Sequence, residues 1–316
     1  MHLVKPSYEI WSNNLPAIQR IERAGRVCYK SEDKITVTSG EPFCRKLLNV
    51  LKHESVFEHV SLGLQVTGEQ YIRLQHWPLR PTDLPVSRAH LRYTANRDRC
   101  VISGNIRAWR DTLKLQYDIP AIAKALVRWY PLFFADLSPN AERYLGEVPE
   151  YIYVYTPAEL LEHETVTVKF IVDRGVTHEL VRHRPVAYSQ ESTRYCNYGR
   201  AGHVTFVIPP WLSILPGTYV AVPHVNPFAE SARWYETVRA AELSYLNLLK
   251  DGWSPQQARS VLPNSLKTEI VATATLRQWR HILSLRTAEN AHPQMQEVMC
   301  PLKSDMQVRY SEIFNG

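Results

Sequence analysis

The residues best suited to chemistry lie in one short stretch, RHRPVAYSQESTRYCNYG, which spans residues 182–199. It brings Arg182, His183, Arg184 and Arg194 within thirteen residues, separated mainly by small and neutral polar side chains. Arginine binds phosphate through two parallel hydrogen bonds, and turns of this composition also expose hydroxyl and backbone N–H groups. The stretch therefore predicts a binding site for a phosphate or a nucleotide.

A surface ion-pair network is the alternative interpretation of the same stretch, and its nearest acids are Glu179 and Glu191. In an extended segment, alternate residues share one face. The two arginines of the RHR triplet would then point the same way, and so would Gln190, Ser192 and Arg194. This shared direction favours binding of one ligand over a dispersed network.

Other catalytic patterns in this part of the chain are incomplete. The histidines of HELVRH (178–183) are five residues apart, about 140° round a helix, whereas a zinc protease needs them four apart. Cys196 has no histidine near it in the sequence to lower its thiol pKa, so it is interpreted as a packing residue. Ser189 and Ser192 lie outside any G-x-S-x-G turn. We expect neither a metal site nor a cysteine or serine nucleophile.

A second group of cations lies near the C-terminus, at Arg259, Arg277, Arg280, His281 and Arg286. Arg277 and Arg286 are nine residues apart, which places them about 180° apart on a straight helix. These side chains cannot all contact one ligand, and Arg280 is the one we expect on the surface.

Composition narrows the class of protein. The 316 residues are 45% apolar, carry a formal net charge of +6, and contain no apolar run long enough for a membrane span. The N-terminus lacks a signal peptide pattern, and the five cysteines form no C-x-x-C pair. We expect a cytoplasmic protein with an anionic ligand such as a nucleotide, without disulfides, and not a nucleic-acid or membrane protein.

Hydrophobic periodicity predicts a mixed α/β (α+β) fold with helices dominating the C-terminal half. Ser254, Pro255 and Gln257 predict a capped helix start, and Asp251–Gly252 predicts the end of the helix before it. The predicted helices are 15–31, 41–54, 105–115, 120–136, 138–146, 227–252 and a broken helix over 262–287. The predicted strands are 61–68, two around a turn at 96–98, and 164–175.

The chain resembles the flavin-dependent thymidylate synthases, the ThyX family. RHRPVAYSQES fits the family signature of R-H-R, seven residues and S, and six blocks occur in family order. The blocks are RAGRVCYKS (23–31), HESVFEHVS (53–61), DRGVTHELVRHR (173–184), QESTRYCNY (190–198), ARSVLPNSLKTEIV (258–271) and LRQWRHILSLR (276–286). The resemblance covers about 1–66 and 165–305.

The resemblance implies a central, mostly antiparallel sheet with flanking helices, in one domain (1–316) with a long insertion at about 67–164. It implies a homotetramer with shared active sites that converts dUMP to dTMP. Methylenetetrahydrofolate would supply the carbon, and FAD, reduced by NADPH, would supply the hydride.

The resemblance also implies individual roles. The flavin-contact positions fall on Ser55, Glu58, Arg182, His183, Arg184, Gln190, Thr275, Arg277 and His281. The dUMP-contact positions fall on Glu179, Arg182, Gln190, Glu191, Ser192, Thr193, Arg194, Arg259 and Arg286. Arg286 is expected to be catalytic, because a fixed guanidinium favours the ionised pyrimidine N3, and that anion makes C5 nucleophilic.

Some positions depart from the family pattern. An acid is common where Gln190 stands, and asparagine is frequent at Ser189, Thr275 and His281. Short family members lack the 67–164 segment, which is interpreted as an elaboration on the tetramer surface or as part of a modified substrate or folate pocket.

Two other functions remain open on the sequence. One is a pyrimidine nucleotide hydroxymethylase, in which water ends the reaction. The other is a non-catalytic nucleotide- or RNA-binding protein on the same scaffold, against which the retained Arg194, Arg259 and Arg286 argue.

Overall fold

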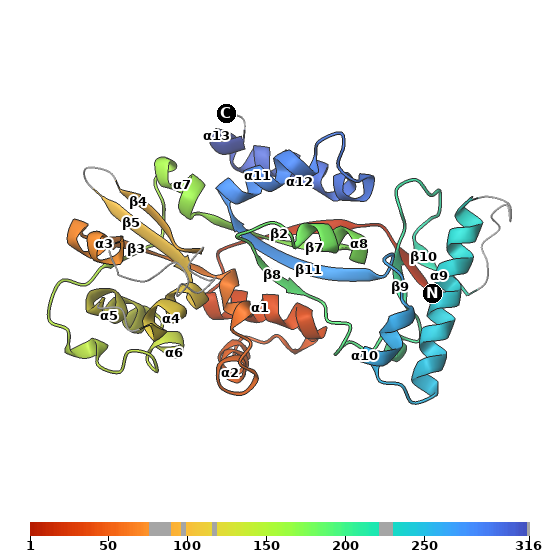
Figure 1. Cartoon of the computed structure of the whole chain (residues 1–316), viewed down its shortest axis with the longest axis horizontal. Helices are drawn as coiled ribbons and strands as arrows, with labels where there is room; N and C mark the ends of the chain where they lie inside the picture. Colours follow the sequence, from red (N-terminus) through yellow and green to blue (C-terminus); the bar gives the residue numbers. More distant parts are fainter. Residues whose placement is uncertain (76–89, 96–98, 116–118, 221–229, 315–316) are drawn as a thin grey trace.

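The computed structural model describes residues 1–75, 90–95, 99–115, 119–220 and 230–314. Three sheets follow one another along the long axis of the molecule (Figure 1). The central sheet lies between a lobe built largely from the 67–164 segment and a second lobe around the N-terminus and α9 (Glu230–Lys250). The mixed α/β class predicted from the sequence is confirmed.

The central sheet has the strand order β2-β7-β11-β8, and every neighbouring pair is antiparallel. Its strands are β2 (Ser7–Trp11), β7 (Thr165–Asp173), β8 (Ala187–Gln190) and β11 (Lys267–Thr275). The strand predicted at 164–175 is confirmed as β7. This sheet carries the segments that resemble the family signature.

The two faces of the central sheet differ because side chains alternate along a strand. On β11, Ile270, Ala272 and Ala274 join the apolar core beneath α11 (Leu276–Arg286) and α12 (Pro293–Arg309). The other parity carries Lys267, Glu269, Thr273 and Thr275 toward the side of α1 (Ala17–Tyr29) and the 3-10 helix η3 (Glu54–His59). Figure 1 shows α11 and α12 on one side of the sheet and α1 on the other. Glu269 and Thr273 therefore lie on the face toward α1 and η3, whereas the face beneath α11 and α12 is mainly apolar.

The prediction of a broken helix over 262–287 is wrong for its first half. Residues 267–275 form the strand β11, and the helix begins only at Leu276. The alternation of Thr268, Ile270, Ala272 and Ala274 with polar residues is a strand pattern, and pairing with both β7 and β8 outweighs any helical preference. The short helix α10 (Pro255–Ala258) and the turn η8 (Arg259–Val261) precede the strand.

The helix starts and stops predicted around residues 250–257 are confirmed. Ser254 forms a capping box with Gln257, and Pro255 occupies the first helical turn. Helix α9 ends at Lys250, and Gly252 has a φ of +88°, a left-handed conformation that glycine adopts without a steric penalty. Residues 227–229 of the predicted helix lie outside the described residues.

The N-terminal helices predicted at 15–31 and 41–54 are confirmed as α1 and as α2 (Gly40–Lys46), which continues into the π-helical turn η2 (Leu47–Leu51). Their buried residues share one core with the 67–164 segment, in which Phe57 contacts Phe133 with ring centroids 5.3 Å apart. The segment is therefore joined to the rest of the chain by a continuous apolar interior.

The 67–164 segment extends the strand β3 (Ser61–Val66) into an antiparallel sheet of order β4-β5-β3-β6. The added strands are β4 (Arg92–Ala95), β5 (Cys100–Asn105) and β6 (Glu150–Ile152). The segment's helices are α3 (Gly68–Gln75), α4 (Ile106–Lys114), α5 (Pro120–Trp129), α6 (Pro131–Phe134) and α7 (Pro157–His163). The predicted strands and the helices at 105–115 and 120–136 are confirmed, and the turn at 96–98 lies outside the described residues.

The helix predicted at 138–146 is wrong, because only the 3-10 turn η6 (Ala141–Arg143) forms there. Only six residues lie between Pro139 and Gly146. A helix that short forms too few hydrogen bonds to offset the free-energy cost of its first turn.

The lobe around the N-terminus holds the third sheet, of order β10-β1-β9. Its strands are β1 (His2–Val4), β9 (Thr205–Val207) and β10 (Gly217–Thr218), and the buried Tyr235 and Tyr245 of α9 pack against them. The remaining elements are η1 (Glu32–Lys34), α8 (Arg174–Leu180), η7 (Tyr198–Ala201) and α13 (Ser311–Phe314). None of the described helices is long and apolar enough to cross a membrane.

Candidate functional site

The predicted site residues separate into three places around the central sheet. Glu179, His183, His281 and Arg286 form the Arg286 cluster, between the end of α8 and α11. Residues 190–194 form a turn after β8. Glu58 and Thr275 line a narrow cleft between the central sheet and the β4-β5-β3-β6 sheet, which we call the Glu58 cleft.

In the Arg286 cluster, one guanidinium is held by two predicted partners. Arg286 Nη1 donates to Glu179 Oε2 at 2.7 Å, and Nη2 donates to the Glu179 carbonyl oxygen at 3.2 Å. Arg286 Nε donates to His183 Nε2 at 2.8 Å. A guanidinium has five N–H donors. Two N–H groups of Arg286 therefore remain for a ligand after these three contacts.

His183 is neutral in this cluster at physiological pH. Burial lowers the pKa of its imidazole to about 4, and the charge of Arg286 and the neighbouring His281 act in the same direction. The His183 and His281 rings lie edge to face with centroids 6.2 Å apart. A neutral imidazole can accept the Arg286 hydrogen bond, so the histidine orients the guanidinium without repelling it.

The RHR triplet is not extended. The expectation that Arg182 and Arg184 share one face requires an extended segment, so it does not apply. Residues 181–185 follow α8 as turns, and Arg184 Nη1 donates to the carbonyl oxygen of Val181 at 2.6 Å. Arg182 and Arg184 are both exposed, whereas His183 is buried. The turn separates the cations, so that the histidine faces the protein and the arginines face outward.

The turn at 190–194 is anchored by backbone contacts and by the ion pair between Glu191 and Lys267. Ser192 N donates to the Cys28 carbonyl oxygen at 3.0 Å, and the Glu191 carbonyl oxygen accepts from Arg174 Nη2 at 2.9 Å. Gln190 Nε2 donates to Thr177 Oγ1 at 2.9 Å. The exposed Arg194 lies beside the ring of Tyr195. The turn is rigid, and its arginine remains directed outward.

Arg259 joins this turn and not the Arg286 cluster. Its Nη1 donates to Thr193 Oγ1 at 2.9 Å. Arg277, at the start of α11, pairs instead with Glu162, and Arg280 is exposed as expected. The expectation that the C-terminal cations cannot all serve one contact is confirmed.

Sequence reasoning missed a cluster of three lysines around Glu269, which we call the Glu269 cluster. Lys30 and Lys267 each place Nζ 2.5 Å from Glu269 Oε1, and Lys169 places Nζ 2.5 Å from Oε2. Burial alone would raise the pKa of Glu269, but the three lysines outweigh it and lower this pKa to about 2. Lys267 also pairs with Glu191 at 3.0 Å. The alternation along 267–275 was the signal that could have placed Lys267 and Glu269 on one face.

A cavity of about 290 Å³ lies between this cluster and the 190–194 turn. Lys30, Glu191 and Lys267 line it on one side, and Tyr29, Tyr195 and Tyr198 contribute aromatic surface. Cys196 also lines it, and burial raises the pKa of its thiol to about 11, with the charge of Glu191 acting in the same direction. Little thiolate would exist at neutral pH, which argues against a nucleophilic role.

In the Glu58 cleft, residues of the 67–164 segment meet predicted flavin contacts. Arg107 Nη1 lies 2.6 Å from Glu58 Oε1, and His90 Nε2 lies 3.9 Å from Glu58 Oε2. Burial lowers the pKa of His90 to about 4, with nearby arginines contributing, so this contact joins a neutral imidazole to the carboxylate. Thr275 Oγ1 accepts from Gln278 N at 3.3 Å and thereby caps α11, whereas Ser55 is exposed on η3.

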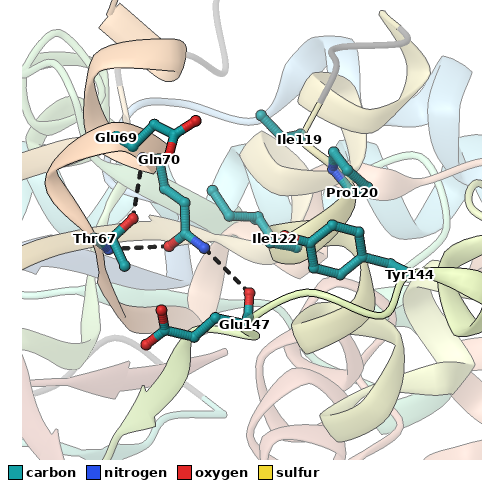
Figure 2. Close-up of a pocket in the computed structure, with 9 residues that line it drawn as sticks. Thr67, Glu69, Gln70, Ile119, Pro120, Ile122, Tyr144 and Glu147 are labelled. Carbon is teal, nitrogen blue, oxygen red and sulfur yellow. Dashed lines mark hydrogen bonds between the residues drawn. The ribbon is translucent and has the colours of Figure 1, made fainter.

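A larger cavity, of about 440 Å³, lies within the 67–164 segment and away from all predicted site residues (Figure 2). The Gln70 side chain bonds to backbone groups of this cavity: Thr67 N donates to Gln70 Oε1 at 3.0 Å, and Gln70 Nε2 donates to the Glu147 carbonyl oxygen at 3.3 Å. Ile119 and Ile122 form part of its wall. Within the described ranges, no three His, Cys, Asp or Glu side chains come together as metal ligands.

The fold and the site thus define an α/β protein with several exposed arginines around a central antiparallel sheet. The family model described as thymidylate synthase complementing protein, Thy1, matches residues 12–145 and 138–307. The chain belongs to this family, and the resemblance predicted from the sequence is confirmed.

Curated relatives carry the name flavin-dependent thymidylate synthase. That of Thermococcus onnurineus is 32% identical over 148 residues, which are 46% of this chain and 55% of the relative. That of Mycobacteroides abscessus is 34% identical over 155 residues, 48% of this chain and 59% of the relative. That of Geobacter sulfurreducens is 35% identical over 133 residues, 42% of this chain and 52% of the relative. The chain spans about half the length of the curated relatives it matches.

Proposed function

We propose that the protein is a flavin-dependent thymidylate synthase, which methylates dUMP reductively to dTMP. The observation that carries the proposal is the Arg286 cluster, in a chain of the Thy1 family. Arg286 is held by Glu179 and His183 and keeps two N–H donors for a ligand. Methylenetetrahydrofolate would be the carbon donor and NADPH the source of reducing equivalents.

The chemistry assigned to Arg286 follows from its fixed geometry. A guanidinium that cannot reorient favours the anionic form of a pyrimidine N3 beside it, and the charge then raises the electron density at C5. Carbon C5 would form a bond to the methylene carbon and lose its proton, and the bond from that carbon to the folate nitrogen would break to release tetrahydrofolate. Glu179 and His183 would act by holding the guanidinium in place.

Some of the residues assigned to dUMP would bind its charge, and others would position the turn beside it. Arg194 and Arg259, both exposed, would bind the phosphate, and Ser192 and the Thr193 backbone would add uncharged donors. Glu191 and Gln190 would shape the turn beside them, and Arg182 would close it from the side of the RHR triplet. The 290 Å³ cavity beside this turn supports such a site.

The residues assigned to the flavin offer polar groups that a dinucleotide could bind. Arg184, Arg277 and His281 are exposed; Arg277 pairs with Glu162, and His281 lies in the Arg286 cluster. In the Glu58 cleft, Asn105 Nδ2 is buried without a hydrogen-bond partner among the described residues, which a bound polar group would satisfy. Bound FAD, once reduced, would supply the hydride that completes the methyl group. Ser55, Glu58, His183, Gln190 and Thr275 would complete its site.

We further propose a cytoplasmic homotetramer with active sites shared between subunits. The outward-facing Arg182, Arg194 and Arg259 support this, because binding one nucleotide through them needs a surface to enclose it. Light scattering should then give about four times the 36.5 kDa chain mass.

The decisive experiment measures tritium release from 5-tritiated dUMP by the purified protein, with its flavin spectrum recorded. We expect a yellow protein that releases tritium only with methylenetetrahydrofolate and NADPH. Product mass separates methylation, a gain of about 14 mass units, from hydroxymethylation, a gain of about 30, since the products carry a methyl or a hydroxymethyl group. A colourless protein that FAD cannot reconstitute would exclude the proposed function.

A further inference from the structure

Helix α4 of the 67–164 segment contacts η3 through three ion pairs, and in two of them the cation has the same exposure. Arg107 pairs with Glu58 at 2.6 Å, and Lys114 pairs with Glu54 at 2.8 Å. The side chains of Arg107 and Lys114 are each 39% exposed, and their carboxylate partners are 14% and 18% exposed. The two pairs differ in position, since only Glu58 lines the cleft that also holds Pro185 and Thr275.

The 67–164 segment supplies one wall of the Glu58 cleft. His90, Arg92, Ser103 and Asn105 of this segment line the cleft opposite residues of β11. The Asn105 side chain is 4% exposed, and its Oδ1 caps α4 by accepting from Ala108 N at 2.8 Å. Its Nδ2 has no partner among the described residues. The cleft has a volume of about 30 Å³, so this buried amide donor marks a place for a water molecule or for the edge of a polar group.

The charge state of Glu58 depends on groups from several elements. Arg107 and Asp111 face it from α4, His90 from the chain before β4, and Arg184 from the turn after α8. Burial raises the pKa of Glu58, and Arg107 opposes this increase through a hydrogen bond and its charge. Arg107 is thus the principal group that keeps the carboxylate ionised and directed along the cleft.

We propose that Arg107 is a positioning residue for the flavin: it holds Glu58 as an oriented carboxylate acceptor, so the 67–164 segment forms part of the cofactor site. The inference rests on the proposed function and on the assignment of Glu58 to flavin contact. On this inference, the 67–164 segment is more than a surface elaboration, because Arg107 of its helix α4 favours the ionised form of Glu58. Asn105, beside Arg107 at the start of α4, donates to the same bound cofactor.

Loss of Arg107 has a consequence that a purely structural contact lacks. With a neutral side chain at position 107, Glu58 takes up a proton closer to neutral pH and is no longer a fully ionised acceptor. Flavin affinity then falls at lower pH and recovers at higher pH, where Glu58 ionises again. Loss of a packing contact would weaken binding equally at every pH.

The test titrates FAD into apo-protein between pH 6 and pH 9 and follows the quenching of flavin fluorescence. For Arg107→Gln we expect about tenfold weaker binding at pH 6, equivalent to about 1.4 kcal/mol, and recovery toward the wild-type Kd at pH 9. Arg107→Lys keeps a charge and should restore most of the affinity. Glu58→Gln should bind weakly at all pH values, because its amide does not titrate in this range.

Lys114→Ala is the matched control, since it removes one neighbouring ion pair between α4 and η3 while Arg110 remains paired with Glu54. It should lower thermal stability about as much as Arg107→Gln and leave the Kd for FAD unchanged. Asn105→Ser retains a helix-capping oxygen but removes the amide donor, and it should weaken FAD binding without a pH dependence.

Two results would overturn the inference while the proposed function stands. One is a wild-type pH profile of FAD binding in Arg107→Gln, and the other is an unchanged Kd in Glu58→Gln, which needs no folded Arg107 variant. Failure of the wild-type protein itself to bind FAD would instead remove the proposed function.

Discussion

The Arg286 cluster and the Glu269 cluster both join cations to a carboxylate, but they differ in what they leave unsatisfied. Glu179 is 37% exposed and Arg286 20% exposed, and the guanidinium retains two N–H donors. Glu269 is 6% exposed, and three lysines surround its two oxygens. The buried and charge-compensated carboxylate of Glu269 is expected to stabilise the fold, although Lys30 and Lys267 also line the 290 Å³ cavity. The Arg286 guanidinium is oriented and keeps donors, so it can bind a ligand.

The largest effect that separates the two clusters is expected from Arg286→Ala. It should lower kcat/KM for tritium release by about 10²–10³-fold, as removal of a group that stabilises developing charge does. The midpoint of thermal unfolding should change little, because the side chain is partly exposed. Unaltered turnover in a folded Arg286→Ala protein would show that this cluster has no catalytic role.

Glu269→Gln should lower the free energy of unfolding rather than the catalytic rate. Removing one partner of a buried pair costs about 3–5 kcal/mol, and we expect about 2 kcal/mol here because the lysines are partly solvated. Urea unfolding measures this loss. The control is Glu32→Gln, since Glu32 lies at the solvated edge of the same cluster, 3.4 Å from Lys30, and should contribute less than about 1 kcal/mol. Equal losses in the two variants would contradict the distinction.

The contributions of His183 and Glu269 to the free energy of unfolding should change over different pH ranges. His183 has a folded pKa of about 4 against an ordinary value of 6.5, so the unfolded chain binds more protons and stability falls as pH drops from 6.5 to 4. Glu269 has a folded pKa of about 2 against 4.5, so its contribution is complete above pH 4.5 and is lost toward pH 2.

His183→Gln should therefore reduce the slope of the unfolding free energy against pH, between pH 6.5 and 4, by up to about 1.4 kcal/mol per pH unit. Glu269→Gln should differ from wild type mainly above pH 4.5, and the difference should shrink in more acid solution. Urea titrations at pH 7, 5.5, 4.5 and 3 test both windows. Parallel curves for wild type and His183→Gln would mean that this histidine is already charged in the folded protein.

The smallest effect is expected from Cys196→Ala. Its thiol lines the 290 Å³ cavity beside the 190–194 turn, but its raised pKa leaves it protonated at neutral pH. Turnover should stay close to wild type, and stability should fall by about 1 kcal/mol through lost packing. A decrease in kcat comparable with that of Arg286→Ala would restore Cys196 as a candidate nucleophile.

The fold was predictable where local patterns dominate. The caps at Ser254 and Gly252, the apolar face of α1 and the alternation of β7 depend on neighbours within a few residues. The strand β11 was missed because its residues can also form a helix, and only pairing with β7 and β8 decides between the two. The helix expected at 138–146 did not form, and the carbonyl oxygens of Glu142 and Tyr144 instead accept hydrogen bonds from Lys124.

The site was predictable in its residue types but not in its pairings. The ordered blocks, read together as a family pattern, identified Glu179, His183 and Arg286, which the structure brings together. Nothing in the spacing indicated that Lys30 meets Glu269, 239 residues away, or that Arg107 meets Glu58. The roles assigned to these residues remain predictions until the variants are measured.

The sequence by itself determined the family, the mixed α/β class and most of the helices, because ordered motifs and local periodicity are written along the chain. Only the tertiary structure decided which cation meets which carboxylate, which side chains keep donors for a ligand, and that the 67–164 segment reaches the Glu58 cleft. The physical reason is that charge and burial act through space. Their effect on a side chain is set by neighbours that folding brings from more than a hundred residues away, as with Arg286 and Glu179.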